Sequence, residues 1–227
     1  MTEERVTLRE VTEPLSYDAI VQRLSHAYDG GATERDQRPR AAWKVALRDA
    51  FLARLLDEGR ERLVELGAGP GHDSLFFQEA GLTVTAIDPS PEMVGLCRAK
   101  GLDARRGDFL NPGLPPESAD AIWTMNSLLH VPNAELPAVL DSIRSLLRPG
   151  GLFFLGVYGG QDEEGLAPQD DHDPPRFFSF RSDQTLRVWV DPHFDVVEFR
   201  VVNEGTRDRS QALTLRRPDT LFSGATP

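Results

Sequence analysis

The chain has 227 residues, 40% of them hydrophobic and 27% charged, a composition typical of one globular domain with a substantial core. Its net charge of -11, without a Lys/Arg cluster, argues against a nucleic-acid partner, because most of the surface would repel a polyphosphate. No apolar run reaches the roughly 18 to 20 residues of a membrane-spanning helix, the N-terminus lacks a secretion signal and the single Cys97 excludes an internal disulfide, so we expect a cytoplasmic protein with no membrane partner.

Residues 1–40 are polar and interrupted by proline and glycine, and they have room for at most one short helix, around Tyr17–Tyr28. We expect this segment to be an N-terminal helical lid, followed by a main domain at residues 41–227. From Ala41 the apolar residues recur at i+4 spacing, which predicts an amphipathic helix that ends near Gly59.

Strands and helices alternate after this helix. The expected strands are Arg62–Leu66, Thr83–Ile87, Asp103–Gly107, Ala119–Thr124 and Leu152–Val157. The expected helices are His72–Ala80, Pro91–Lys100 and Leu136–Leu147. Five strands that alternate with helices predict a parallel sheet covered on both faces, which is a doubly wound α/β fold.

The last part of the chain follows a different pattern. Gln161–Asp173 is acidic and predicted to be a loop, and a short helix is expected near Ser182–Val190. Two strand candidates, Asp195–Asn203 and Gln211–Arg216, are separated by a turn-rich segment and predict an antiparallel hairpin at the edge of the sheet. The whole sheet would then have seven, mostly parallel, strands.

Glycines follow the first expected strand at Gly67, Gly69 and Gly71. They let the backbone turn tightly and approach a ligand, while the next helix directs its positive end to the same place, which suits a carboxylate or phosphate. The spacing differs from the dinucleotide fingerprint Gly-x-Gly-x-x-Gly, since position 72 is His. A tight turn without a ligand is the alternative. Asp88, at the end of the second strand, favours a ligand, because an acid there can accept hydrogen bonds from both ribose hydroxyls.

With this acid, the motif Glu65-Leu-Gly-Ala-Gly-Pro-Gly71 resembles the first motif of the class I S-adenosylmethionine-dependent methyltransferases of the small-molecule type. Gly107–Phe109, Asp120–Asn126 and Leu147–Gly151 resemble later segments of that family, so the resemblance covers about residues 63–157. It implies a Rossmann-like fold and S-adenosylmethionine as the cofactor.

The resemblance also implies roles for individual residues. The expected cofactor-binding residues are Glu65, Gly67, Ala68, Gly69, Gly71, Asp88, Pro89, Met93, Asp108, Phe109, Asn126, Tyr28, Arg40 and Trp43. The glycine loop would hold the methionine part, Asp88 the ribose and Asp108 the adenine amino group. Asn126 would lie near the methionine amino group or the sulfonium, although an asparagine that only caps a turn is equally compatible with the sequence.

Other residues are expected near the methyl acceptor. His130 follows the fourth strand and is the best-placed base if the acceptor loses a proton, the alternative being a structural histidine bonded to a loop carbonyl. Tyr17 and Phe178 are expected to contact the acceptor, Tyr17 from the lid and Phe178 from an aromatic segment after the fifth strand. Arg40 could pair with the cofactor carboxylate, and Trp43 could cover the methionine part of the cofactor. The alternative is that Arg40 is only a surface charge and that Trp43 only packs its helix.

Three further signals carry no function. Asp173–Phe177 echoes a motif of amino-directed methyltransferases but follows the wrong strand, Cys97 is away from the reaction centre, and the acidic run Asp170–Asp173 is expected to be solvated rather than to bind a metal. The sequence thus predicts an enzyme that methylates O or N of a small molecule. An RNA- or protein-directed methyltransferase and a noncatalytic cofactor-binding protein are the alternatives, and neither the acceptor nor the oligomeric state follows from the sequence.

Overall fold

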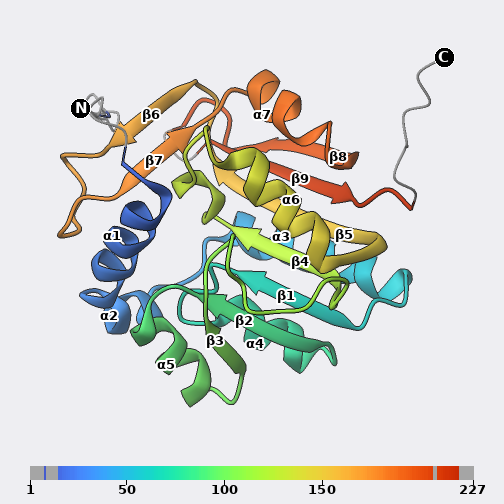
Figure 1. Cartoon of the computed structure of the whole chain (residues 1–227). Coiled ribbons are helices and arrows are strands. Elements are labelled where there is room, and N and C mark those ends of the chain that lie inside the picture. The colour runs from blue at the N-terminus through green and yellow to red at the C-terminus, as the bar shows by residue number, and fades with distance from the viewer. Residues whose placement is uncertain (1–7, 9–14, 207–208, 220–227) are drawn as a thin grey trace.

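The computed structural model describes residue 8 and residues 15–206 and 209–219, so most of the first 14 residues of the expected lid lie outside the described chain. The described residues form a seven-stranded sheet in the order β3-β2-β1-β4-β5-β9-β8 (Figure 1). Its strands are β1 (Arg62–Leu66), β2 (Thr83–Asp88), β3 (Asp103–Arg106), β4 (Ala119–Met125), β5 (Leu147–Tyr158), β8 (Asp195–Val202) and β9 (Ser210–Arg216). β9 runs antiparallel to both neighbours, which confirms the mostly parallel sheet with a hairpin at its edge.

Helices cover both faces of the sheet, as the doubly wound prediction requires (Figure 1). They are α1 (Tyr17–Asp29), α2 (Ala32–Gln37), α3 (Ala42–Asp57), α4 (His72–Glu79), α5 (Pro91–Ala99), α6 (Leu136–Leu146) and α7 (Asp183–Val190), with a 3₁₀ turn η1 (Leu128–His130). α6 and α7 pack on one face, while α3 and α4 pack on the other. α1 and α2 lie against α5. In the described part of the chain no helix is long and apolar enough to cross a bilayer.

Local sequence explains where the helices near the site begin. Ser90 caps α5 by accepting a hydrogen bond from the Met93 backbone N–H at 3.1 Å, and Pro91 occupies the first turn, where a missing N–H costs nothing. α4 begins directly after Gly71, whose φ of 81° lies in the left-handed region. Both helices therefore direct their N-termini to the carboxyl edge of the sheet, where the glycine loop lies.

The core beneath the site is aromatic. Trp123 of β4 is fully buried and stacks on Phe154 of β5, with ring centroids 4.1 Å apart. Phe51 of α3 and Phe77 of α4 pack against the same indole. Leu63 of β1 belongs to the same cluster, so this layer fixes the positions of β1 and β4, whose ends carry the site residues.

Three elements differ from the expectations. Residues 1–40 hold a second helix, α2, because a buried Ala32 and contact with α5 stabilise a polar segment that has no apolar period of its own. Gln161–Asp173 is not all loop: β6 (Glu163–Leu166) pairs antiparallel with β7 (Phe177–Phe180). The carboxylate of Glu164 accepts hydrogen bonds from Ser179 Oγ at 2.7 Å and from the Asn133 N–H at 2.6 Å, which offsets the cost of placing acids in a strand.

Candidate active site

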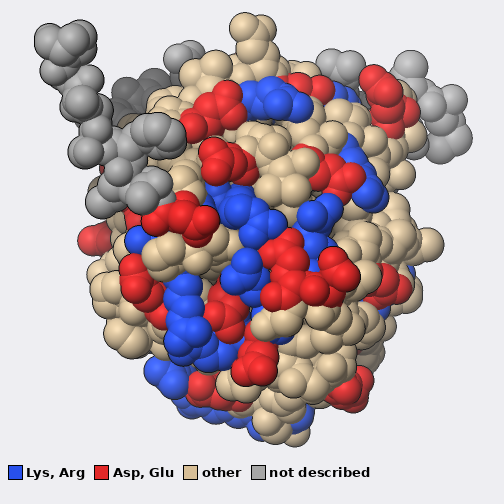
Figure 2. All heavy atoms as spheres, turned by 90° about the vertical axis from the view of Figure 1, so that its right-hand side faces the viewer, with Lys and Arg blue, Asp and Glu red and all other residues tan. Residues whose placement is uncertain are grey.

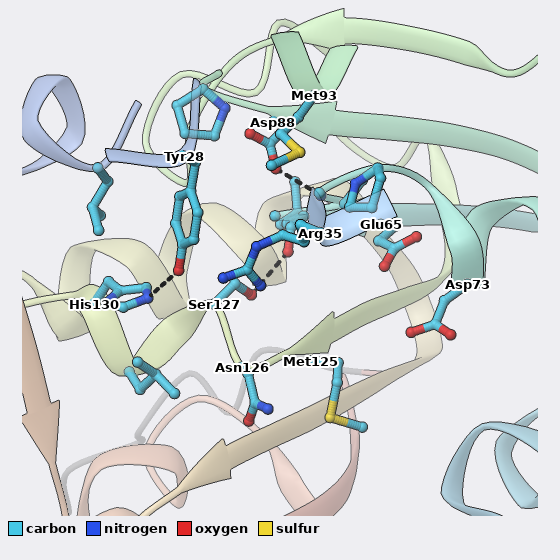
Figure 3. Close-up of a pocket in the computed structure, with 18 of the residues that line it drawn as sticks. Tyr28, Arg35, Glu65, Asp73, Asp88, Met93, Met125, Asn126, Ser127 and His130 are labelled. Atoms are coloured by element: carbon cyan, nitrogen blue, oxygen red, sulfur yellow. Dashed lines mark hydrogen bonds between the residues drawn. The ribbon is translucent and has the colours of Figure 1, made fainter. Parts of the chain in front are cut away.

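A cavity of about 480 Å³ opens at the carboxyl edge of the sheet, within the size range of small-molecule sites. Its floor consists of lining residues between 65 and 131, from the ends of β1, β2 and β4 and the loops after them. Its cover consists of lining residues from 17–44, 158 and 176–178, contributed by α1, α2, the start of α3, β5 and β7. Figure 3 shows side chains of both layers pointing into the space between them.

The glycine loop of the floor is close-packed on one side and open on the other. Gly67 and Gly71 have φ angles of 78° and 81°, and a Cβ on Gly71 would lie 2.7 Å from both Cys97 Sγ and Leu102. A Cβ on Gly69 would meet nothing within 4 Å, although its φ of 55° also favours glycine. The loop therefore fits tightly onto the core and leaves free space above Gly69 for a ligand.

Asp88 lies at the end of β2 and is buried. Its Oδ2 accepts a hydrogen bond from the Gly69 N–H at 2.8 Å, and its Oδ1 accepts one from the Ser90 N–H at 2.9 Å. Burial nevertheless raises the pKa of Asp88 to about 6. Each carboxylate oxygen keeps a second acceptor position, which suits the paired hydroxyls of a ribose.

Glu65 and Asp73 form a buried acidic pair behind the loop. Ser74 Oγ donates to Glu65 at 2.5 Å, and burial together with the Asp73 charge raises the pKa of Glu65 well above its usual range. Arg40 lies 2.6 Å from Asp73, and its Nε is buried without a hydrogen-bond partner among the described residues. Arg40 therefore links the cover to the floor and keeps its Nε donor unpaired among the described residues. Its expected contact with a cofactor carboxylate stays a prediction.

Asp108 marks the other end of the floor, near Phe109, Pro89 and Met93, which line the same cavity. Its Oδ1 accepts hydrogen bonds from the Leu110 N–H at 2.8 Å and from the Tyr17 hydroxyl at 3.3 Å. Burial and the Asp108 charge raise the pKa of Tyr17. The structure thus places Tyr17 beside the residue expected to bind adenine, and its predicted contact with the acceptor is not tested by this arrangement.

Asn126 follows β4 and has a φ of 56°, an uncommon conformation for a residue other than glycine. Its backbone N–H donates to Gly156 O at 2.7 Å, and its Oδ1 is buried without a partner among the described residues. Asn126 lines the cavity, and Figure 3 shows it beside Met125. An unsatisfied carbonyl dipole there suits the ammonium or sulfonium expected of the cofactor.

His130 lies where β7 and α1 meet the floor. Its Nδ1 donates to the Phe177 carbonyl at 2.7 Å, which leaves Nε2 to accept the Tyr28 hydroxyl proton at 2.8 Å. Arg176 Nη1 donates to the same Tyr28 oxygen at 3.0 Å. Burial and the nearby Arg176 charge lower the pKa of His130 to about 3. Both imidazole nitrogens are engaged, and the ring is neutral at physiological pH.

The structure gathers the remaining expected residues around these groups. Ala68, Trp43 and Phe178 line the same cavity; Trp43 packs edge-on against Tyr158, and the Phe178 ring lies 4.8 Å from His130. Within Asp170–Asp173, Asp171 and Asp173 are exposed as expected, whereas Asp170 accepts two hydrogen bonds from the Arg176 guanidinium. Arg35 and Ser127 also line the cavity, and no motif in the sequence pointed to either.

Sequence comparisons place the floor of this cavity in a known domain. The profile of a family described as "Methyltransferase domain" matches residues 63–151. An uncharacterized methyltransferase of Geobacillus kaustophilus is 28% identical over 151 residues, which are 65% of this chain and 69% of that protein. The ubiquinone biosynthesis O-methyltransferase of Xanthomonas campestris is 33% identical over 128 residues, 53% of this chain and 52% of that enzyme, so the alignment spans about half of that relative.

Solved structures share the fold. The 1,6-didemethyltoxoflavin-N1-methyltransferase of Burkholderia thailandensis, with bound S-adenosylhomocysteine, superposes with a TM-score of 0.69 at 24% identity over 93% of this chain and 95% of its own. The Synechocystis magnesium protoporphyrin IX methyltransferase with its bound cofactor gives 0.66 at 18% identity, over 91% and 100%. The [4+2]-cyclase SpnF gives 0.70 at 19% identity, over 88% and 97%. At these identities the likeness shows the fold.

Proposed function

We propose that this chain, whose residues 63–151 match the profile described as "Methyltransferase domain", is a class I S-adenosylmethionine-dependent methyltransferase that methylates an oxygen or nitrogen atom of a small molecule. The observation that carries the proposal is a cavity of about 480 Å³ in which the expected cofactor residues of the floor face an aromatic cover. A compact space of this kind accommodates a small acceptor beside the cofactor.

The residues of the floor fit the cofactor. We assign the glycine loop, together with Arg40 of the cover, to its methionine carboxylate, Asp88 to its ribose and Asp108 to its adenine, because each still has hydrogen-bonding capacity. Asn126 Oδ1, which lacks a partner, would accept from the cofactor ammonium. When bound, S-adenosylmethionine supplies an electrophilic methyl group. The chain then has to align the acceptor with this methyl group and exclude water.

The surface supports a small acceptor over an RNA. On the face shown in Figure 2, acidic and basic side chains are interspersed, and the net charge of -11 is unfavourable for a phosphate backbone. Among the solved structures that share this fold, the Burkholderia thailandensis enzyme is a 1,6-didemethyltoxoflavin-N1-methyltransferase with 1,6-didemethyltoxoflavin bound. Both observations favour a small-molecule acceptor for this chain.

Calorimetry with S-adenosylhomocysteine, followed by a screen of phenols, amines and carboxylates for release of that product from S-adenosylmethionine, tests the proposal. We expect micromolar or tighter binding and turnover of at least one small acceptor. Tighter binding of NADH than of S-adenosylhomocysteine would overturn the cofactor assignment. Binding without turnover of any small acceptor, together with methylation of RNA or protein, would overturn the acceptor class.

We propose that His130 is a positioning residue rather than the base that removes the acceptor's proton. A group with a pKa of about 3 is a weak base at neutral pH, and its Nε2 already accepts the Tyr28 proton. The variant His130→Ala should therefore keep the shape of the pH profile of kcat between pH 5 and pH 8. Tyr28→Phe should show the same loss in kcat as His130→Ala. A base role would instead appear as a loss of roughly 100-fold or more in His130→Ala at unchanged S-adenosylhomocysteine affinity.

A further inference from the structure

Charged side chains are segregated between the two layers of the cavity. Those of the floor, apart from histidines, are all acidic: Glu65, Asp73, Asp88 and Asp108. Those of the cover are all basic: Arg35, Arg38, Arg40, Lys44 and Arg176. A basic cover is unexpected in a chain with a net charge of -11. Each basic side chain of the cover therefore needs either an acidic partner in the protein or an anionic ligand.

Three of the cover arginines are neutralised by partners in the protein. Arg38 pairs with Glu34 at 2.6 Å. Arg40 pairs with Asp73 at 2.6 Å, and Arg176 makes a two-pronged ion pair with Asp170 at 2.7 Å. The charges of Arg38 and Arg176 are therefore largely satisfied before a ligand binds. Arg40 is neutralised by Asp73, and its unpartnered Nε is the donor assigned to the cofactor carboxylate.

Arg35 differs from these three. Among the described residues, its guanidinium makes neither an ion pair nor a side-chain hydrogen bond, and its carbon lies 4.6 Å from the centroid of the Tyr28 ring. The side chain is half-buried, and Figure 3 shows it pointing from α2 into the cavity. Stacking on Tyr28 holds the planar group while its donors stay available.

We propose that Arg35 selects a methyl acceptor that carries an acidic group, a carboxylate or an anion of the same geometry. The inference rests on the proposed function and names the acceptor class. A guanidinium presents its donors in a fork that matches a carboxylate, and partial burial strengthens such a pair relative to one in water. The rings of Tyr28, Trp43 and Phe178 add flat apolar surface, which suits an aromatic acid in particular.

Pairs of aromatic acids and their neutral carboxamides test this proposal, for example 3,4-dihydroxybenzoate with 3,4-dihydroxybenzamide and 4-aminobenzoate with 4-aminobenzamide. Binding is measured by calorimetry on the full chain saturated with S-adenosylhomocysteine, and turnover with S-adenosylmethionine follows for every pair that binds. We expect the acids to bind about 10- to 100-fold more tightly than the amides. The variant Arg35→Gln should abolish this preference.

Arg38→Gln is the matched control, because it removes a nearby arginine of the same cavity whose side chain is 57% exposed and paired with Glu34. It should keep the preference for acids. Circular dichroism and S-adenosylhomocysteine affinity establish that each variant is folded.

Acids that bind no better than their amides, or a preference that survives in Arg35→Gln, would overturn the inference. So would an Arg35→Gln variant that loses S-adenosylhomocysteine affinity and keeps acid selectivity, because Arg35 would then serve the cofactor carboxylate. These outcomes are distinct from failure of the proposed function, in which the unmodified protein binds no S-adenosylhomocysteine or methylates no small acceptor, acidic or neutral.

Discussion

We expect the buried carboxyl of Asp88 to make cofactor affinity depend on pH. Its pKa of about 6 in the folded chain is raised by burial, so the folded state retains a proton that the unfolded state has lost between about pH 4 and pH 6, and this group's contribution to stability falls as the pH rises through that window. Ribose binding, by contrast, is best served by the ionised form. We expect S-adenosylhomocysteine affinity to fall by up to about tenfold from pH 7 to pH 5.

Isothermal calorimetry across this pH range measures the effect, and Asp88→Asn is the control because an amide cannot ionise. That variant should bind more weakly at pH 7 and show a flat profile. An unchanged affinity between pH 5 and pH 7 in the unmodified protein would contradict the role given to this carboxyl.

Some of the site residues that sequence reasoning identified are fixed by local backbone demands. Gly71 must be glycine because of its φ and its contact with Cys97, and Asp88 ends a strand whose pattern is easily recognised. Arg35 carries no such signature, and Tyr28 meets His130 across 102 positions of the chain. Contacts of this kind depend on how α1 and α2 dock, which a single sequence does not specify.

The cover is held by a small apolar cluster of its own. Ile20 and Leu24 of α1 pack with Phe177 of β7, apart from the large clusters on the two faces of the sheet. We expect Ile20→Ala to loosen the cover, since truncating a buried isoleucine typically costs about 2 to 5 kcal/mol. Hydrogen exchange should accelerate in Tyr17–Asp29 while β1 and β4 remain protected, and S-adenosylhomocysteine should restore part of the protection.

Leu56→Ala provides the comparison, because Leu56 is 57% exposed on α3. It should leave exchange in α1 unchanged. Equal acceleration throughout the sheet in Ile20→Ala would mean that the cover and the sheet unfold as one unit, and an unchanged rate in α1 on ligand binding would exclude a lid that closes on the cofactor.

The elements that could be predicted are those whose pattern has one clear period, such as α6, with its apolar stripe on the sheet. α2 and the β6–β7 pair lacked this signal. α2 depends on a tertiary contact with α5, and β6 depends on cross-strand partners for its acids, as in Glu164 with Ser179. Tertiary context decided both elements against their local composition.

For the whole molecule, ligand binding should appear as thermal stabilisation. At about 100 times its dissociation constant, S-adenosylhomocysteine adds roughly 2.7 kcal/mol to the free energy of unfolding. For a chain of this size that corresponds to a rise in Tm of about 5 to 10 °C. Differential scanning calorimetry measures it, with NADH at the same concentration as the control. An equal rise with NADH, or none with S-adenosylhomocysteine, would contradict the cofactor assignment.

The three tryptophans lie at different places in the fold, so intrinsic fluorescence can report whether the cavity is occupied. Trp123 is sealed in the core and Trp189 lies on α7, packed on the core away from the cavity, whereas Trp43 lines the cavity and touches Tyr158. Indole fluorescence responds to the immediate surroundings of the ring. We therefore expect a ligand in the cavity to change the emission of Trp43, while the emission of Trp123 and Trp189 stays unchanged and serves as an internal reference. Occupancy can thus be followed in real time without a label.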